Sequence, residues 1–356
     1  MNSKDRIMLA IEHKEPDRVP RTFTFTPEFR NSILNYYGLK KDQLHGLDVK
    51  IGNDVKFANH GYADETRKDK TGSFTDKWGI EWKAVNYKKG DKIGKYIEAV
   101  KNPLSEDNSI DKYISPDPKD EDYSNTKTLI KKYGNDYAII GSIVQTIFES
   151  GWQLRGLEKM MMDFVLNEDL AHRILDITYN YHKAVGIKLV RMGVDIIWVG
   201  DDVGAQNGMM LSPDIWRKFL KPRMSEMFDE FKRINPGIKI AYHSDGSIYP
   251  IIEDLIEIGL DILNPIQPKC MDPYLLKKRY GKKLCFWGTI DVQETLPFGS
   301  REEIKKEVMD RISGLAPDGG FIAAPAHNVQ YDTPVENFIA LISYLDEYGH
   351  YPIKSK

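Results

Sequence analysis

This chain of 356 residues has few cysteines, no long apolar run and a small net charge. It has two cysteines, Cys270 and Cys285, which argues against a disulfide framework and favours a reducing compartment. No run approaches the roughly 18 apolar residues of a membrane span, and the first residues lack an apolar signal segment. We therefore expect a cytoplasmic protein. The net charge of −3 gives no reason to expect nucleic acid or an anionic membrane as a partner.

Two glycine-rich signatures are also missing. Neither the Gly-x-Gly-x-x-Gly fingerprint nor the Gly-x-x-x-x-Gly-Lys-Ser/Thr phosphate loop occurs, which weakens nucleotide-binding functions. Hydrophobic residues make up 41% of the chain and charged residues 29%, which is typical of a soluble globular protein with a large core.

The chain does contain a repeated alternation of short apolar runs and amphipathic helices. Residues 239–268 show it best, with a strand ending at His243, a helix over 248–259 and a second strand ending at Asn264. Further strands are predicted to end near residues 25, 144, 199, 288 and 325. Strand–helix alternation with short connections favours a parallel sheet, and we predict an α/β fold, a closed (β/α)8 TIM barrel.

The predicted barrel uses residues 1–356 as a single domain. Roughly residues 45–125 are the least regular part, and we interpret them as an N-terminal insertion near the barrel mouth, with a hairpin around Trp78 and a turn at Gly90. Seven strands can be assigned. The eighth is either hidden in the insertion or a different division of the region around Ile262.

Polar side chains follow several of the predicted strands, at the end where parallel α/β folds bind ligands. His243 ends one strand, Asp245 comes two residues later, and His327 follows the last apolar run. Two imidazoles and a carboxylate can form a three-ligand zinc site with an open position. Two plainer interpretations remain open: a lone histidine is more often structural, and Asp245 can cap the following helix.

Further carboxylates lie at other strand ends. Glu149 follows the strand that ends near residue 144 and is either a site residue or a surface carboxylate of a helix. Asp201 and Asp202 are adjacent, so one is expected to face the pocket while the other caps a helix or is solvated. We take Glu149, Asp202 and Asp245 as the catalytic candidates.

Amides and aromatic rings at strand ends are candidates for substrate binding. We expect the amides to orient a polar substrate and the rings to stack on it, although about half of the aromatic residues near the mouth would be core. The predicted substrate-binding residues are Phe25, Trp198, Asn264, Gln267 and Trp287. Cys285 is expected in the core and Asp291 in a turn, whereas Cys270 could reach a metal.

Several motifs resemble the uroporphyrinogen decarboxylase superfamily. They are Arg18-Val19-Pro20, the Trp78-Gly79 hairpin, His243-Ser-Asp-Gly246 with Asn264, Trp287-Gly-Thr-Ile-Asp291 through Gly299, and Ala324-Pro-Ala-His-Asn328 before Thr333-Pro. The resemblance covers nearly the whole chain and is most specific after residue 190. It implies a (β/α)8 barrel with a deep site at its mouth.

One branch of this superfamily decarboxylates uroporphyrinogen without a cofactor. Its hallmark is an Arg-Gln-Ala-Gly-Arg segment after the first strand, where the present chain has Arg21-Thr-Phe-Thr-Phe-Thr-Pro27. A substrate with many carboxylates needs guanidinium partners, because bidentate Arg is the natural partner of a carboxylate. The missing motif therefore argues against porphyrinogen decarboxylation.

The other branch contains zinc-dependent methyltransferases that work with a corrinoid protein. Members acting on methyl-corrinoid and coenzyme M carry His-x-Cys and a distant Cys, whereas Asp245 and His327 stand at those two cysteine positions here. The resemblance thus implies a zinc ion held by His243 and His327 with Asp245 or Glu149. Such a set is harder and more Lewis acidic than a thiolate-rich one, and it is better suited to the oxygen of a methyl ether or alcohol.

The expected function is an O-demethylase-type methyltransferase. It would move a methyl group from a methoxylated small molecule, foremost an aromatic methyl ether, to the cobalt(I) corrinoid of a partner protein. Two alternatives remain: a lyase of the decarboxylase branch acting on another substrate, and a non-catalytic barrel that binds a corrinoid protein. A homodimer is compatible with each of them.

Overall fold

A parallel sheet of seven strands forms the centre of the computed structural model, which describes residues 1–60, 72–89 and 92–353. Each strand pairs in parallel with the next in sequence order, so all of their carboxyl ends lie on one face. The strands are β1 (Val55–Asn59), β5 (Ala138–Ser142), β6 (Ile196–Gly200), β9 (Lys239–His243), β10 (Ile262–Asn264), β11 (Cys285–Trp287) and β12 (Phe321–Ile322).

An extended segment over residues 20–26 closes this sheet into a barrel. Its Thr22 N–H donates to the carbonyl of Ala323 at 3.0 Å, and the Ala323 N–H donates to the carbonyl of Pro20 at 2.8 Å. On its other side, the Asp54 N–H donates to the carbonyl of Arg21 at 3.0 Å. The segment therefore acts as an eighth strand between β12 and β1, and the predicted α/β barrel is confirmed.

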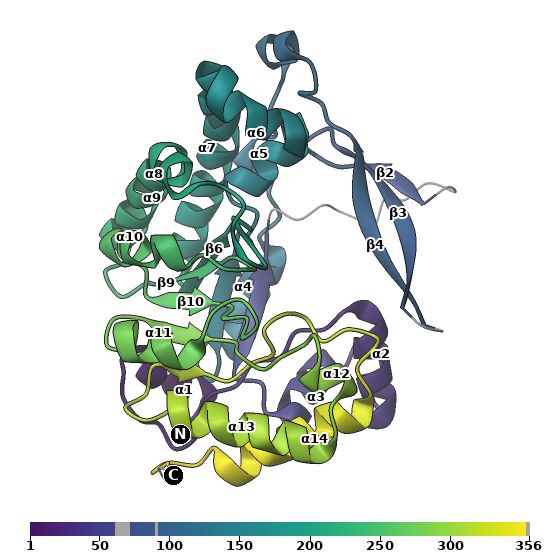
Figure 1. Cartoon of the computed structure of the whole chain (residues 1–356), viewed down its shortest axis with the longest axis vertical. Coiled ribbons are helices and arrows are strands. Elements are labelled where there is room, and N and C mark those ends of the chain that lie inside the picture. Colours follow the sequence, from purple (N-terminus) through teal and green to yellow (C-terminus); the bar gives the residue numbers. More distant parts are fainter. Residues whose placement is uncertain (61–71, 90–91, 354–356) are drawn as a thin grey trace.

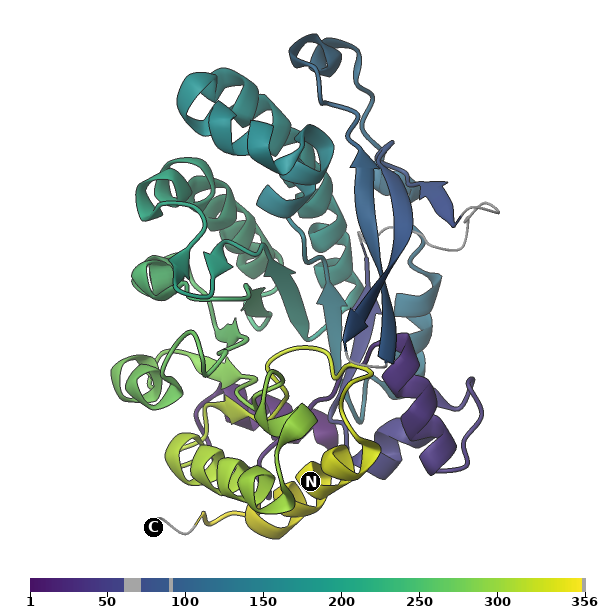
Figure 2. The same cartoon turned by 45° about the vertical axis from the view of Figure 1, so that its right-hand side comes forward.

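β1 is the strand that the sequence left unassigned, and it lies within residues 45–125, one of the two places considered. α3 (Leu44–Ile51) and β1 belong to the barrel, whereas β2 (Ser73–Thr75), β3 (Glu81–Lys89) and β4 (Lys92–Lys101) form an antiparallel arm. The arm stands beside the barrel (Figures 1 and 2). The predicted hairpin is present as the β3–β4 pair, although its turn at Gly90 and Asp91 lies outside the described residues.

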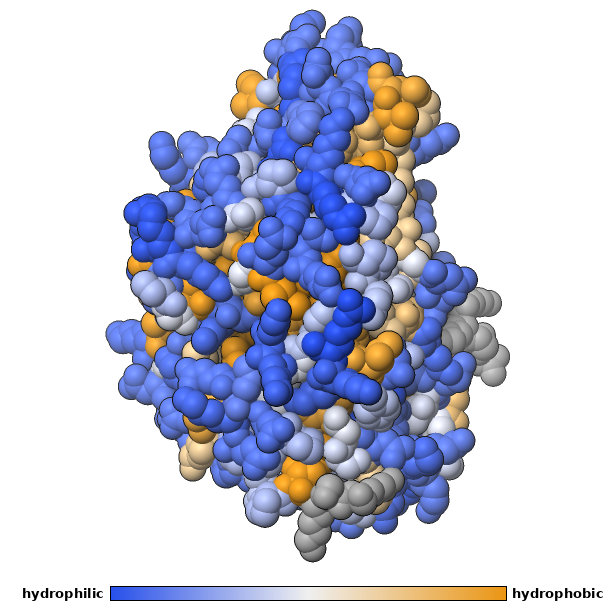
Figure 3. All heavy atoms as spheres, turned by 60° about the vertical axis from the view of Figure 1, so that its left-hand side comes forward, coloured by the Kyte–Doolittle hydropathy of each residue, from blue (hydrophilic) through white to orange (hydrophobic). Residues whose placement is uncertain are grey.

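Helices cover the outside of the barrel; in the view of Figure 1, α7 to α11 lie on its left and α12 to α14 along its lower side. The face shown in Figure 3 is mainly hydrophilic, with scattered hydrophobic patches. No helix in the described part of the chain is both long and apolar enough to cross a membrane. The helices are α1 (Ser3–Ile11), α2 (Pro27–Tyr36), α4 (Ser124–Tyr133), α5 (Phe148–Arg155), α6 (Leu157–Leu166), α7 (Glu168–Met192), α8 (Pro213–Phe219), α9 (Lys221–Ile234), α10 (Ile252–Glu257), α11 (Pro273–Tyr280), α12 (Thr295–Phe298), α13 (Arg301–Leu315) and α14 (Val335–Tyr348).

The barrel interior is a separate apolar cluster, which Ile7 and Ile11 of α1 plug at one end. Ala241 and Ile262 belong to this inner cluster. Side chains of a strand alternate between its two faces, so the residues two positions later face the interior as well. Those residues are His243 and Asn264, the last of their strands. The strand period therefore aims both polar side chains into the barrel mouth.

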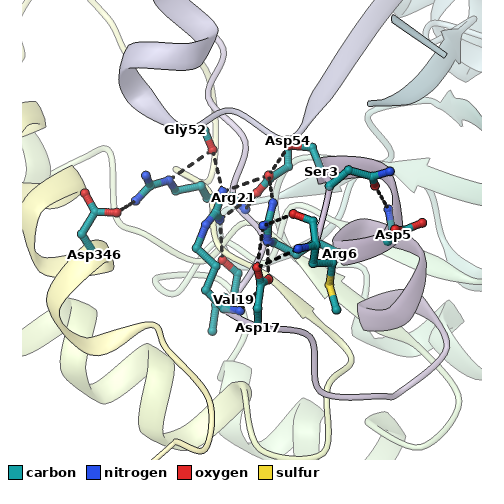
Figure 4. Close-up of polar contacts among 12 residues, drawn as sticks. Ser3, Asp5, Arg6, Asp17, Val19, Arg21, Gly52, Asp54 and Asp346 are labelled. Atoms are coloured by element: carbon teal, nitrogen blue, oxygen red, sulfur yellow. Dashed lines mark hydrogen bonds and ion pairs between the residues drawn. The ribbon is translucent and has the colours of Figure 1, made fainter. Parts of the chain in front are cut away.

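A buried carboxylate ties the closing segment to the first helix (Figure 4). Asp54 is fully buried and accepts hydrogen bonds from the guanidinium groups of Arg6 at 2.7 Å and Arg18 at 2.8 and 2.9 Å. It also accepts from the Ser3 hydroxyl at 2.8 Å and from the Arg21 backbone N–H at 2.9 Å. One side chain thus holds α1 and the eighth strand of the barrel.

Replacing Asp54 with Ala should cost about 3–5 kcal/mol of unfolding free energy, because Arg6 and Arg18 would lose their shared buried partner. Urea denaturation measures this cost. Lys306→Ala, which removes a side chain that is 77% exposed in its ion pair with Asp310, is the control and should leave the midpoint unchanged. Equal midpoints for Asp54→Ala and the unmodified protein would contradict the assignment.

Candidate functional site

A cavity of about 940 Å³ lies at the carboxyl ends of the strands. Three aromatic rings from different strands line it side by side: Trp198 packs 4.9 Å from Phe57 and 4.8 Å from Trp287, centroid to centroid. Phe25 lines the cavity as well. The volume is at the upper end of the roughly 300–1,000 Å³ usual for small-molecule pockets.

Three potential metal ligands gather beside these rings. Asp202, His243 and Asp245 each offer one ligand atom, and these atoms all lie within 4.8 Å of one another. His243 Nε2 is 3.8 Å from Asp202 Oδ1, and His327 Nε2 is 3.8 Å from Asp245 Oδ2. Two donors on a tetrahedral zinc ion, each about 2.0–2.1 Å from it, lie roughly 3.4 Å apart. Small side-chain adjustments would therefore bring Asp202, His243 and Asp245 onto one ion, whereas His327 lies outside this group and contacts it through Asp245.

The adjacent pair Asp201–Asp202 divides its roles as predicted. Asp202 lines the cavity, whereas Asp201 is 1% exposed and accepts hydrogen bonds from the backbone N–H groups of Ile147 and Glu149 at the start of α5. Glu149, in the first turn of α5, lines the cavity and accepts from the Asp202 N–H at 3.0 Å. The segment after β6 and the start of α5 are therefore joined by hydrogen bonds to the carboxylates of Asp201 and Glu149.

Burial and mutual repulsion disfavour the charged forms of these carboxylates. Burial raises the pKa of Asp201 to about 7. Burial, followed by the nearby charges of Asp202 and Asp201, raises the pKa of Glu149 well above its ordinary value. Burial also raises the pKa of Asp245. A divalent cation bound among these groups would offset the repulsion and favour their ionised forms.

Asn264 lines the cavity and orients His243. Its Nδ2 donates to the carbonyl of Trp287 at 3.1 Å, which leaves its Oδ1 as the atom facing His243 Nδ1 at 2.7 Å. Because that oxygen can only accept, His243 must carry its proton on Nδ1, and Nε2 keeps the lone pair that a metal needs. Nε2 is the atom that faces Asp202.

Gln267 supports the loop that carries Asp245, and it is not among the described residues that line the cavity. Its Oε1 accepts from the Gly246 N–H at 2.9 Å and from the Cys270 thiol at 3.3 Å. Gly246 has φ +77°, and a Cβ there would lie 2.6 Å from the Ala205 nitrogen, so the turn after Asp245 requires glycine. The Cys270 thiol is therefore bonded to the side-chain amide of Gln267.

The remaining polar predictions fall into structural positions. Cys285 is fully buried, and Asp291 accepts from the backbone N–H groups of residues 293–295. Both residues therefore act in packing or in turns.

Two unpaired polar atoms test whether a metal suits this place. Asp245 Oδ1 and His327 Nδ1 are buried without a hydrogen-bond partner. In the described residues no backbone N–H of the following helix is bonded to Asp245, so the capping alternative is not seen. A buried polar atom without a partner is costly, and a cation beside Asp245 would remove that cost. The nitrogen and oxygen donors present fit a zinc ion.

β1 supplies cavity residues that the sequence interpretation missed, above all Phe57 and Asn59. Val55 and Phe57 alternate with Lys56 and Ala58 in a five-residue strand. That alternation is a weak strand signal, and Lys56 interrupts the apolar run. Phe57 packs against Trp198 and completes the aromatic side of the cavity.

Residues 90–348 match the family model described as uroporphyrinogen decarboxylase (URO-D). The chain belongs to this family. It is 27% identical over 223 residues to the methylcobamide:CoM methyltransferase MtaA of Methanosarcina barkeri, and the match covers 62% of each chain. MtaA of the M. barkeri strain Fusaro is 26% identical over 225 residues, again with 62% coverage of both. The URO-D family chain therefore matches 62% of the length of these relatives.

A solved structure shares the whole fold. A methyltransferase from Methanosarcina mazei superposes with a TM-score of 0.69 at 20% identity, over 98% of this chain and 99% of the other. The likeness shows that this member of the URO-D family has the barrel and the arrangement of elements of that methyltransferase.

We predict that His243→Ala and His327→Ala each bind less than one tenth of the zinc bound by the unmodified protein, because each removes a neutral nitrogen donor from the cluster. Zinc content after dialysis, measured by mass spectrometry, checks this. The control is His350→Ala, since His350 is exposed and is not among the described residues that line the cavity. Full zinc content in both cluster variants would remove His243 and His327 as ligands.

Proposed function

We propose that this URO-D family protein is a zinc-dependent methyltransferase. It moves a methyl group from a methoxylated small molecule, foremost an aromatic methyl ether, to the cobalt(I) corrinoid of a partner protein. The carrying observation is one cavity that joins an aromatic wall to a cluster of imidazole and carboxylate donors. The similarity to the MtaA methyltransferases supports methyl transfer and a corrinoid partner.

In this reaction the carbon–oxygen bond of the methyl ether breaks, and the methyl carbon bonds to cobalt(I), which supplies the electron pair. The oxygen leaves with the electrons of the broken bond, as a phenolate when the donor is aromatic. An ether oxygen is a poor leaving group, so it needs an electrophile beside it. A bound zinc ion supplies Lewis acidity that stabilises this developing charge.

The chain's own residues orient the groups. Asn264 fixes the tautomer of His243, and the Glu149–Asp202 hydrogen bond fixes the carboxylate of α5 against the β6 loop. Trp198 lies 5.7 Å from the His243 ring, centroid to centroid, so an aromatic ring packed on this wall would lie beside the donor cluster. A methoxylated ring bound in this way would have its oxygen within reach of the cluster, and the rings would keep water away from it.

The donor set favours an oxygen substrate over a thiol. Thiolate ligands suit a site that activates a thiol, whereas imidazole and carboxylate leave a metal more Lewis acidic. Asp202, Asp245, His243 and His327 supply oxygen and nitrogen donors, and the Cys270 thiol donates to Gln267. The MtaA relatives are named for transfer to CoM, which is a thiol. Because the donor set here suits an oxygen substrate, we infer that a methyl ether takes the place of CoM as the second substrate of this chain.

The direct test is methyl transfer to cobalt(I) corrinoid, followed by absorbance, with a panel of methyl ethers, alcohols and amines. We expect turnover with at least one methoxylated aromatic compound, loss of that turnover after zinc removal, and recovery when zinc is restored. The circular dichroism spectrum should stay unchanged after zinc removal, because the barrel core contains no metal ligand. Equal activity of the metal-free protein would contradict the proposal.

The direction of the Arg21 side chain, in the closing segment over residues 20–26, disfavours the decarboxylase alternative. Arg21 is buried, donates to Asp346 at 2.7 Å and to the Gly52 carbonyl at 3.2 Å, and is not among the described residues that line the cavity (Figure 4). Of the cations that do line it, Lys56 is already paired with Asp48. Arg30 and Lys132 also line the cavity, but the guanidinium at the place of the missing motif, Arg21, is turned away from it, so a substrate with many carboxylates would lack that partner.

Incubation with uroporphyrinogen should accordingly yield no coproporphyrinogen. Chromatography of the oxidised porphyrins measures this, with a porphyrinogen decarboxylase as the positive control. A product with fewer carboxyl groups that grows with enzyme concentration would show that the argument from the missing arginine motif is wrong.

A further inference from the structure

The connection between β5 and α5 contains a residue with a strained backbone that lines the cavity. Gln145 has φ +63°, in the left-handed region that residues other than glycine rarely adopt. It is half-buried and lines the cavity beside Glu149, four residues further along the chain. Such backbone conformations cost free energy and are concentrated at active sites and ligand-binding loops. Gln145 is therefore a candidate for a role in the reaction.

Hydrogen bonds to β6 on both sides of Gln145 impose this conformation. Before it, the Ile143 N–H donates to the carbonyl of Trp198 at 2.8 Å. After it, the Thr146 N–H donates to the carbonyl of Gly200 at 3.0 Å, and the Gly200 N–H donates to the Thr146 hydroxyl at 3.0 Å. These contacts hold Gln145 in a conformation that its own side chain does not favour.

The amide of Gln145 differs from the other amides at the strand ends. Asn264 and Gln267 are both hydrogen-bonded to protein groups, to His243 and to the Gly246 N–H among others. Within residues 1–60, 72–89 and 92–353, no protein group is hydrogen-bonded to the Gln145 side chain. A side-chain amide offers N–H donors and a carbonyl acceptor, and these groups need partners when they leave water. The Gln145 amide is thus available to a molecule bound in the cavity.

Two further uncharged polar residues line the cavity close to Gln145. Asn59 and Ser142 end β1 and β5, which are neighbours, and they are partners in the register of these strands. Two positions earlier, Phe57 and Ile140 contact or belong to the apolar cluster of the barrel interior, so Asn59 and Ser142 face inward as well. None of the three polar residues is charged. They are suited to a neutral oxygen, whereas a carboxylate would need a cation.

We propose that Gln145 is a substrate-binding residue whose amide hydrogen-bonds an uncharged oxygen substituent of the methyl donor, other than the methoxy oxygen itself. The proposal rests on the proposed function, in which the methoxy oxygen lies at the imidazole and carboxylate donors. A methoxyphenol, for example, is then held at two points. Two-point binding fixes how the ring is turned on the aromatic wall, which stacking alone leaves free.

Substitution of Gln145 by glycine separates substrate binding from a purely structural role of the turn. Glycine adopts φ +63° without strain, so Gln145→Gly keeps the connection and removes the amide. Asp318→Gly is the matched control, because Asp318 has φ +64°, is exposed and is not among the described residues that line the cavity. Gln145→Asn restores an amide on a residue type that tolerates this conformation.

Each protein is assayed for methyl transfer from the isomeric methoxyphenols and from methoxybenzene, which lacks the second oxygen, and for binding of the same compounds by calorimetry. We expect Gln145→Gly to lower kcat/KM for the preferred methoxyphenol about tenfold and to weaken its binding by a similar factor, because one neutral hydrogen bond is lost. Its kcat/KM for methoxybenzene and its zinc content should not fall. Its thermal unfolding midpoint should change no more than that of Asp318→Gly, and Gln145→Asn should recover part of the preference.

An equal loss with methoxyphenol and methoxybenzene, or an unchanged preference for methoxyphenol, would overturn the assignment of Gln145. If no compound is demethylated but binding of methoxyphenol still depends on Gln145, the proposed function fails while the binding role of Gln145 stands. If no compound binds or reacts, the assignment of Gln145 is overturned as well.

Discussion

A belt of hydrogen bonds between neighbouring strand ends holds the site, and the arrangement of the donors depends on it. Asp201 caps α5 beside Glu149, whose carboxylate accepts from the Asp202 N–H. The Asp202 carboxylate accepts in turn from the Asp245 N–H at 2.8 Å. His243 then contacts Asn264, which reaches the carbonyl of Trp287. Five successive strands of the barrel are joined in this way: β5, β6, β9 and β10 contribute polar side chains from their carboxyl ends or the segments that follow, and β11 contributes the carbonyl of Trp287.

This belt explains how a site with so many carboxylates can exist in a folded protein. Burial disfavours the charged forms of these carboxylates and raises the pKa of Glu149 and of Asp245, and the nearby charges of Asp202 and Asp201 raise the pKa of Glu149 further. Backbone N–H groups satisfy part of the charge, and Asp245 Oδ1 remains without a partner. A metal ion would complete the set, since Asp202, His243 and Asp245 offer ligand atoms within 4.8 Å of one another.

The sequence could predict the barrel and the placement of the histidines because both follow from local periods. Strand alternation places His243 and Asn264 on the inner face, and the pairing of Asp201 with Asp202 implies that one of them turns away. The contact between His243 and Asn264 could not be predicted, because it joins residues 21 positions apart through the register of β9 and β10. β1 escaped notice because Lys56 interrupts its short apolar run and Phe57 shows its role only beside Trp198.

The central claim is that this cavity binds zinc through nitrogen and oxygen donors alone. X-ray absorption at the zinc edge of the zinc-loaded protein tests it most directly. We expect a first shell of nitrogen and oxygen scatterers at about 2.0–2.1 Å, with the imidazole signature reduced in His243→Ala. A sulfur shell at about 2.3 Å would place Cys270 on the metal and contradict the account.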